Sequence, residues 1–340
     1  AMQFDWSLEV VMIDGVETKV KVAHFRLSHS RKPFIVAYPR ETQEMLLDAF
    51  AQALVFYQGA PNRVLIDNPK TMVVKIGKGK ERDFHPRFLA LMNHYLIKPV
   101  ACTPASGWEK GQVENQVHVI RRQLFTPQLS FDDLASLNTH LLACCHELGQ
   151  KLHPQHKDQT IDVSFEQERL ALNRLGKPFD GYVEKTVRVS STCLVQYDTN
   201  QYSVPCEYAK QRISLRVYAY KLLMIVDQQV IAEHQRSFKK HRYHFEPWHY
   251  VPLLKQKPGA LRDGAPFEDW DLPKPIIAIK DSYLKRDKGD RDFVELLQLI
   301  QDHEPDETAG IDVIQYPALK TPPQANCQRY NQLLTTSAVA

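Results

Sequence analysis

Three acidic residues in this sequence stand where a metal-dependent reaction could be carried out. Asp5 lies within a predicted strand, Asp67 closes a predicted buried strand, and Glu114 lies one turn into a predicted helix. Three carboxylates held close together repel one another, so a cation is needed to keep all of them ionised. Hard divalent ions prefer such oxygen ligands, and two ions about 4 Å apart can bracket a phosphate. The three acids therefore predict metal-assisted phosphoryl transfer without a protein nucleophile.

Other acids compete for these roles, and each acid by itself is weak evidence, because a single Asp at a strand end more often caps a turn. Glu109 is the alternative to Glu114 for the third position. Glu114 is favoured because it lies on the core-facing side of the predicted helix, whereas Glu109 falls in the glycine-flanked loop before it. Asp14 is explained by a hairpin turn and Asp83 by a loop.

The elements that must position the acids follow a defined order. Strand patterns cover residues 3–12, 18–27 and 34–38, and Asp14-Gly15 is a hairpin signal between the first two. The chain then alternates: a helix from Thr42, a strand at 63–67, a basic loop at 75–83, a helix at 86–95, a strand at 98–103 and a helix at 110–124. This order predicts an α/β fold, a mixed sheet with flanking helices. It resembles the ribonuclease H-like fold, in which the ends that carry the three acids converge.

The second half of the chain changes its periodicity. Helical patterns at 131–149 and 160–176 give way to alternating strands, for which a small all-β barrel is expected. After Pro247 the chain is proline-rich, with one clear helix at 291–303. The sequence thus predicts a catalytic domain at 1–130, a helical connector at 131–182, a small β-barrel domain at 183–246 and an irregular, partly helical C-terminal region at 247–340.

Composition excludes several classes of protein. Apolar residues make up 43% of the 340 residues, yet no apolar run reaches the roughly 20 residues that span a bilayer. The start lacks the features of a signal peptide, and none of the six cysteines has zinc-finger spacing, so a cytoplasmic protein without a membrane partner is expected. The net charge is only +3, but basic residues cluster at 75–82, 121–122 and 239–242, which favours a polyanionic partner.

Four segments carry a more specific signal than the acids alone. They are QFDWS at 3–7, AYPRETQE at 37–44, RVLIDNPKTMV at 63–73 and FLALMNHYLIKPVACTPASGWEKGQVEN at 88–115. Together they resemble IstA-like transposases of the insertion-sequence-21 family and, more distantly, retroviral integrase catalytic cores. The resemblance covers about residues 3–125 well and the remainder loosely. It implies Asp5, Asp67 and Glu114 as a DDE triad that holds two Mg²⁺ or Mn²⁺ ions.

The same resemblance implies partners and a place of action. It implies transposon-end and target DNA, a dimer or tetramer assembled on that DNA, an AAA+ ATPase helper protein, and a nucleoid-associated location in a bacterial cytoplasm. Full-length relatives begin with a helix-turn-helix region, whereas this chain starts a few residues before Asp5, so a piece of a longer protein is expected.

Basic and aromatic residues supply candidate contacts to nucleic acid. The candidate DNA-binding residues are Lys70, Lys75, Lys78, Lys80, Lys110, Arg121, Arg122 and Arg212, with Arg188 and Arg216 as further phosphate contacts. The tyrosines of the β region could stack on bases, but packing is the favoured role for Tyr197, Tyr202, Tyr218 and Tyr220. The stretch around Trp248 and Trp270 is expected to be extended and to meet a neighbouring subunit or the helper.

Two alternatives to a transposase remain open at this point. A ribonuclease H-like nuclease would use the same acids to hydrolyse DNA without joining it to a target, and a joining assay separates the two. A non-catalytic DNA-binding or assembly module would retain the fold but bind no Mg²⁺ or Mn²⁺.

Overall fold

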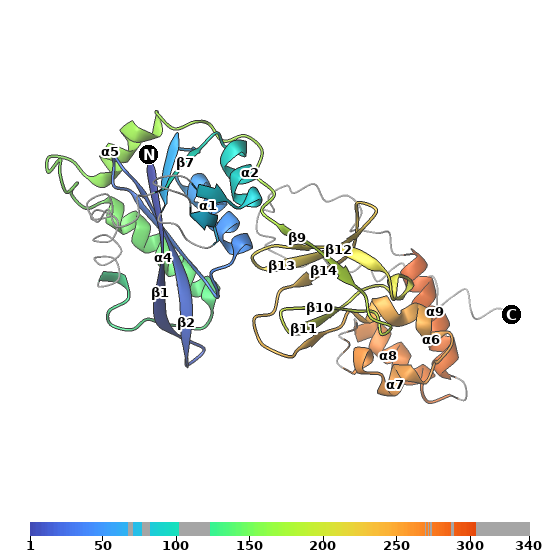
Figure 1. Ribbon diagram of the computed structural model, residues 1–340. Coiled ribbons are helices and arrows are strands. Elements are labelled where there is room, and N and C mark those ends of the chain that lie inside the picture. The colour runs from blue at the N-terminus through green and yellow to red at the C-terminus, as the bar shows by residue number, and fades with distance from the viewer. Residues whose placement is uncertain are drawn as a thin grey trace.

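The computed structural model describes residues 1–66, 71–76, 82–101, 123–268, 270, 272, 274–286 and 289–303. Three parts follow one another along the chain (Figure 1). We call them the sheet unit (residues 2–182), the β unit (residues 183–246) and the helical unit (residues 247–303). The β unit lies between the other two, and hydrogen bonds join it to both.

The sheet unit is built on a mixed sheet with the strand order β3-β2-β1-β4-β7. Strand β2 is antiparallel to both of its neighbours, β1 and β3, whereas β4 and β7 run parallel to β1. Their bounds are β1 Met2–Ile13, β2 Val16–Leu27, β3 Pro33–Tyr38, β4 Arg63–Ile66 and β7 Lys98–Ala101, and the short β8, Ser130–Phe131, pairs with the far end of β1. The mixed sheet with helices that the sequence predicts is confirmed.

A two-residue turn joins the two long strands β1 and β2. Asp14 and Gly15 both take positive φ values, 51° and 70°, which is the conformation that a tight hairpin turn with the right twist requires. Asp14 is therefore a turn residue, as its Asp-Gly sequence indicates.

Helices cover both faces of the sheet. On one face α1 and α2 bury an aromatic cluster that includes Phe4, Phe25, Phe50 and Phe88. On the other face α4 packs Leu137, Leu141 and Cys145 against Val22 and Ile35. The helices of this unit are α1 Gln43–Phe56, α2 Pro86–His94, α4 Leu134–Gly149 and α5 Ile161–Arg169. Alternate strand residues thus enter two separate apolar clusters, one on each face.

Three local predictions for this unit need comment. The predicted loop at 75–83 is wrong in part, because β5 (Val73–Ile76) and β6 (Arg82–Phe84) pair as antiparallel strands. The predicted helix at 160–176 ends at Arg169, and the chain beyond it is held by α2, where Arg87 donates to the carbonyl oxygens of Asp180 and Tyr182. The predicted helix at 110–124 falls almost wholly outside the described residues.

The β unit consists of two sheets around one core. The larger sheet has the order β14-β13-β12-β9 and the smaller has the order β10-β11-β15. Val195, Tyr202, Leu215 and Met224 are at the centre of their shared core. The bounds are β9 Val183–Arg188, β10 Leu194–Tyr197, β11 Asn200–Ser203, β12 Arg212–Val217, β13 Lys221–Val226, β14 Gln229–Gln235 and β15 Tyr243–His244. Pairing within the described residues gives two open sheets, so the predicted closed barrel is not confirmed.

The helical unit is more regular than its composition suggests. Val251, Phe293 and Leu297 are fully or almost fully buried in a core of their own. Its helices are α6 Val251–Leu254, α7 Ala260–Asp263, α8 Lys274–Tyr283 and α9 Gly289–His303. The expected extended stretch is therefore wrong: Trp248 and Trp270 pack edge to face with ring centroids 5.2 Å apart. None of the helices in the described ranges has the length and apolarity to span a bilayer.

Candidate active site at the end of the parallel strands

Asp5 lies on β1, and the alternation of the strand decides which way it faces. The neighbouring rings of Phe4 and Trp6 belong to the apolar cluster under α1, so Asp5 points to the other face of the sheet. The side chain is half-buried, and its Oδ1 accepts a hydrogen bond from the Trp6 N–H at 2.8 Å. The acid is thus held on a rigid central strand, with its carboxylate oriented by the backbone.

The register of the parallel strands brings three chain segments to the level of Asp5. Phe4 pairs with Ile66, and Ile66 pairs with Ala101. Strand β4 ends at Ile66 and β7 ends at Ala101, so both strands end beside the position that precedes Asp5. Asp67 follows Ile66 directly in the sequence, but Asp67 and Glu114 themselves lie outside the described residues. Of the predicted triad, the structure places Asp5 alone.

Buried polar side chains share the sheet face of Asp5. Gln3 and Ser7 are the next residues of β1 on this face, and His24 of β2 lies directly opposite Asp5. All three are at most 8% exposed, and Ser7 Oγ is 2.8 Å from His24 Nε2. Arg26 lies opposite Gln3, and burial lowers its pKa to about 10. The alternation of QFDWS places Gln3, Asp5 and Ser7 on one face of β1, but the sequence pattern alone points only to Asp5 as a site residue.

The other predicted site residues are only partly described. Lys70, Lys78, Lys80, Lys110, Arg121 and Arg122 lie outside the described residues, and Lys75 is described only as a backbone position of β5. Arg212 is exposed at the start of β12, where it faces Arg188 of β9. Within the described part of the chain, no group of three or more His, Cys, Asp or Glu residues could hold a metal ion.

The tyrosines of the β unit pack against other side chains, the role that the sequence favours over stacking on bases. Tyr202 is fully buried in the core. The ring of Tyr220 stacks on Tyr38 of β3 at 6.0 Å, and burial raises the pKa of Tyr220. The hydroxyl of Tyr218 donates to Asp180 at 2.8 Å. Tyr197 lies beneath the Arg236 guanidinium at 5.2 Å. These rings hold the β unit together and attach it to the sheet unit.

Glu44 has a role that its sequence position did not indicate. An acid in the first turn of α1 is expected to face solvent and favour the helix dipole. Instead its side chain is 7% exposed and accepts a hydrogen bond from Arg236 Nη1 at 2.6 Å. Arg236 comes from the end of β14 and also reaches Asp198 at 3.0 Å. A buried charge network therefore joins the β unit to the sheet unit.

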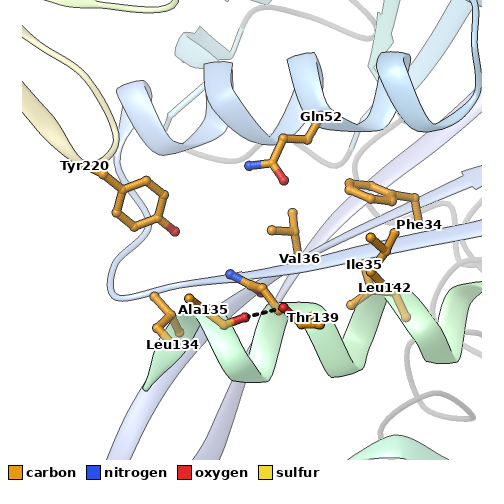
Figure 2. Close-up of a pocket in the computed structure, with 10 residues that line it drawn as sticks. Phe34, Ile35, Val36, Gln52, Leu134, Ala135, Thr139, Leu142 and Tyr220 are labelled. Atoms are coloured by element: carbon orange, nitrogen blue, oxygen red, sulfur yellow. Dashed lines mark hydrogen bonds between the residues drawn. The ribbon is translucent and has the colours of Figure 1, made fainter. Parts of the chain in front are cut away.

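A pocket of about 420 Å³ lies at the edge strand β3, between α1 and α4. Figure 2 shows Gln52 of α1 on one side, Leu134, Thr139 and Leu142 of α4 on the other, and Tyr220 of the β unit at one end. Its lining contains no acid and no basic side chain. It therefore offers neither metal ligands nor phosphate contacts, and Asp5 lies two strands away on β1.

Comparison with known proteins gives relatives of one kind. Residues 175–246 match the family described as Mu transposase, C-terminal domain. A transposase for insertion sequences IS1326/IS1353 from Pseudomonas aeruginosa is 42% identical over 320 residues, which cover 93% of this chain and 62% of that protein. The transposase of insertion sequence element IS21 from the same species is 28% identical over 257 residues, or 75% of this chain and 66% of that one.

Solved structures give weaker matches. The simian T-cell lymphotropic virus intasome matches 70% of this chain at 14% identity and a TM-score of 0.38. The HTLV-2 integrase catalytic core domain in complex with magnesium matches 48% of this chain at 14% identity and a TM-score of 0.33.

The match to the IS1326/IS1353 transposase extends along 93% of the chain, and the family match falls on the β unit and the end of the segment before it. The chain spans 62% of the length of the IS1326/IS1353 transposase. By sequence, this chain is similar to part of insertion-sequence transposases such as those of IS1326/IS1353 and IS21.

Proposed function

We propose that this chain is the catalytic part of a DNA transposase, a DDE polynucleotidyl transferase in which Asp5, Asp67 and Glu114 hold two Mg²⁺ or Mn²⁺ ions. The observation that carries the proposal is the parallel register, in which β4 ends beside the residue before Asp5. In the sequence an aspartate follows each of the paired residues, Asp5 after Phe4 and Asp67 after Ile66. Carboxylates brought together in this way would begin a site for hard cations.

The sheet order supports a ribonuclease H-like catalytic domain. Three antiparallel strands followed by two parallel ones put the first strand at the centre, beside β4. Strand β7, which precedes Glu114 in the sequence, ends at Ala101, the residue that pairs with Ile66. We place the catalytic domain at 1–130, the connector at 131–182, a β-barrel domain at 183–246 and the C-terminal region at 247–340.

The chemistry of the donors fits hard divalent cations, which favour carboxylate oxygens. Such a pair, when bound, lowers the cost of charge on the attacking and leaving oxygens of a phosphodiester. The chain's own contribution is position. Asp5 is fixed by the Trp6 N–H, and the buried Ser7–His24 pair lies beside it on the same face, so little reorganisation is needed when a substrate phosphate arrives.

The proposed substrates and partners come from the likeness to insertion-sequence transposases. We propose cleavage at the transposon end and joining of the freed 3′-hydroxyl to target DNA, by a dimer or tetramer aided by an AAA+ ATPase, in a bacterial cytoplasm at the nucleoid. The proposed DNA contacts remain Lys70, Lys75, Lys78, Lys80, Lys110, Arg121, Arg122 and Arg212.

The test measures cleavage of transposon ends and strand transfer of pre-cut ends into target DNA, both in Mg²⁺, and compares Asp5→Asn with Asp14→Asn. Both variants lose one carboxylate from the β1–β2 hairpin, but Asp14 is a turn residue with a φ of 51°, which Asn tolerates. We expect Asp5→Asn to lose cleavage and joining while still binding DNA, and Asp14→Asn to keep all three. Strand transfer by Asp5→Asn at the parent rate would refute the site. Cleavage without any joining by the parent protein would point instead to a nuclease.

A further inference from the structure

A row of paired side chains lies on the outer face of β9 and β12. The inner-face residues Ile213, Leu215 and Val217 of β12 enter the core of the β unit. The alternate residues therefore face outward. In register, the outward pairs are Arg212 opposite Arg188, Ser214 opposite Thr186, and Arg216 opposite Glu184.

The first of these pairs sets two positive charges against each other. Arg188 and Arg212 are both exposed and directly opposite on adjacent strands. Such residues have Cβ atoms about 5 Å apart, and like charges in this arrangement oppose folding. No carboxylate within the described residues forms an ion pair with either one. The fold therefore keeps an arrangement that an anion between the two guanidinium groups would relieve.

The nearby acid is already engaged, so it does not neutralise the pair. Glu184 accepts a hydrogen bond from Ser214 at 2.6 Å and lies 3.7 Å from the Arg216 guanidinium. Glu184 is at the far end of the row, four residues along β9 from Arg188, a separation on the order of 13 Å. Thr186, next to the arginine pair, is exposed and leaves a hydroxyl available for a phosphate oxygen.

We propose that Arg188 and Arg212 form a clamp for a backbone phosphate of DNA, with the Thr186 hydroxyl beside it. A guanidinium is the side chain best suited to bidentate contact with phosphate oxygens. Two of them on one rigid sheet surround a single phosphodiester without any rearrangement of the backbone. The identity of the polyanion rests on the proposed function, whereas the clamp itself rests on the register and exposure of the two arginines.

The far end of the row contacts the sheet unit, so the position of the clamp relative to that unit is fixed. The Tyr182 ring contacts two guanidinium groups, Arg216 at 4.5 Å and Arg87 at 4.4 Å from its centroid. Arg87 belongs to α2 of the sheet unit, so this stack fixes β9 and β12 relative to that unit. DNA held at Arg188 and Arg212 is thereby held at a set distance from the sheet that carries Asp5.

The experiment measures binding, not catalysis, so that it can fail independently of the proposed function. A fluorescent duplex of about 30 base pairs and arbitrary sequence is titrated in EDTA at several salt concentrations. We expect the double variant Arg188→Glu/Arg212→Glu to lose at least about tenfold in affinity near 0.1 M salt, and the slope of log K against log salt to become shallower by about 1, the value for one lost phosphate contact. Arg188→Lys/Arg212→Lys should retain most of the slope.

A matched control carries the same change of net charge. Lys255 and Lys257 are exposed on the helical unit, and Lys255→Glu/Lys257→Glu should leave the affinity and the slope near those of the parent. An equal loss in this control, or an unchanged slope in the arginine variant, would overturn the clamp.

The single variant Arg188→Glu keeps the proposal testable if the double variant folds poorly. It places opposite charges on β9 and β12, so the thermal midpoint should stay the same or rise while the affinity for DNA falls. A fall in both quantities would show that Arg188 supports the fold instead of binding a ligand, and the proposal would be abandoned.

Discussion

The β unit is attached on two sides by joints of opposite chemistry. Against the sheet unit, Arg236 is inserted between the carboxylates of Glu44 and Asp198, and its side chain is fully buried. Against the helical unit, Ser203 Oγ lies 2.9 Å from His249 Nδ1, and His234 Nε2 lies 2.6 Å from the Ser203 carbonyl oxygen. The first joint consists of full charges and the second of neutral polar groups.

The difference shows how each joint would fail. Burial by itself lowers the pKa of Arg236, but Glu44 and the groups around it reverse that effect, and the net shift is upward. At the second joint burial lowers the pKa of His234 and lowers that of His249 to about 3, so both rings are neutral at pH 7. The charged joint fails when one charge is removed, whereas the neutral joint fails when a charge is added.

The largest effect is expected from Arg236→Gln. The change leaves Glu44 buried, 7% exposed, without its cation, and breaking a buried pair on one side costs about 3–5 kcal/mol. Urea unfolding at pH 7 measures this loss. Glu44→Gln should cost a similar amount, and the double variant less than the sum of the two, because the residues interact directly. A loss below about 1 kcal/mol for Arg236→Gln would mean that the joint is not held by charge.

A smaller effect is expected from acid at the histidine joint. An unfolded histidine titrates near pH 6.5, and the folded-state pKa of His249 is about 3. The neutral ring therefore contributes its full stability above pH 6.5, and that contribution is lost as the pH falls from 6.5 towards 3. Each pH unit is worth up to about 1.4 kcal/mol, so roughly 2 kcal/mol should be lost by pH 5.

The measurement compares unfolding free energies at pH 7 and pH 5. His249→Gln cannot protonate and should show a smaller drop than the parent, whereas His241→Gln, at an exposed position, should show the parent's drop. His244 and Glu246 surround the same joint: burial lowers the pKa of His244 and raises that of Glu246. Identical pH dependence in the parent and His249→Gln would remove His249 from the account.

Local sequence periodicity predicts the sheet of the sheet unit, but it does not predict the contacts that join the β unit to its neighbours. Alternation along QFDWS separates Asp5 from Phe4 and Trp6, so the face of the acid follows from local sequence. Glu44 and Arg236 are 192 residues apart, and nothing in either local pattern signals a partner. In isolation an acid in a first helical turn suggests only the helix dipole. Pairing over such a distance is decided by tertiary packing.

The sequence predictions also differ from the structure in the helical unit, and they extend beyond the described residues at the active site. Prolines such as Pro247 and Pro252 suggest an irregular chain, yet they begin short helices, where a missing N–H costs nothing. Helices of four residues are too short to show a period, so their shared core could not be foreseen. For the triad, the sequence predicts three residues, whereas the structure describes only Asp5. Asp67 and Glu114 remain predictions, which the strand register beside Asp5 supports.

The smallest effect is expected from Arg40→Gln, which probes burial within the charged joint. Arg40 and Arg236 donate to the same oxygen, Asp198 Oδ2, at 2.9 and 3.0 Å. Their side chains differ in exposure, 36% for Arg40 against 0% for Arg236. Water solvates the acid once Arg40 is gone, so the loss in urea unfolding should be about 0.2–1 kcal/mol. An equal loss of stability for Arg40→Gln and Arg236→Gln would show that contact with Asp198, and not burial beside Glu44, stabilises the charged joint. Asp198 alone would then account for the difference between the charged joint and the histidine joint.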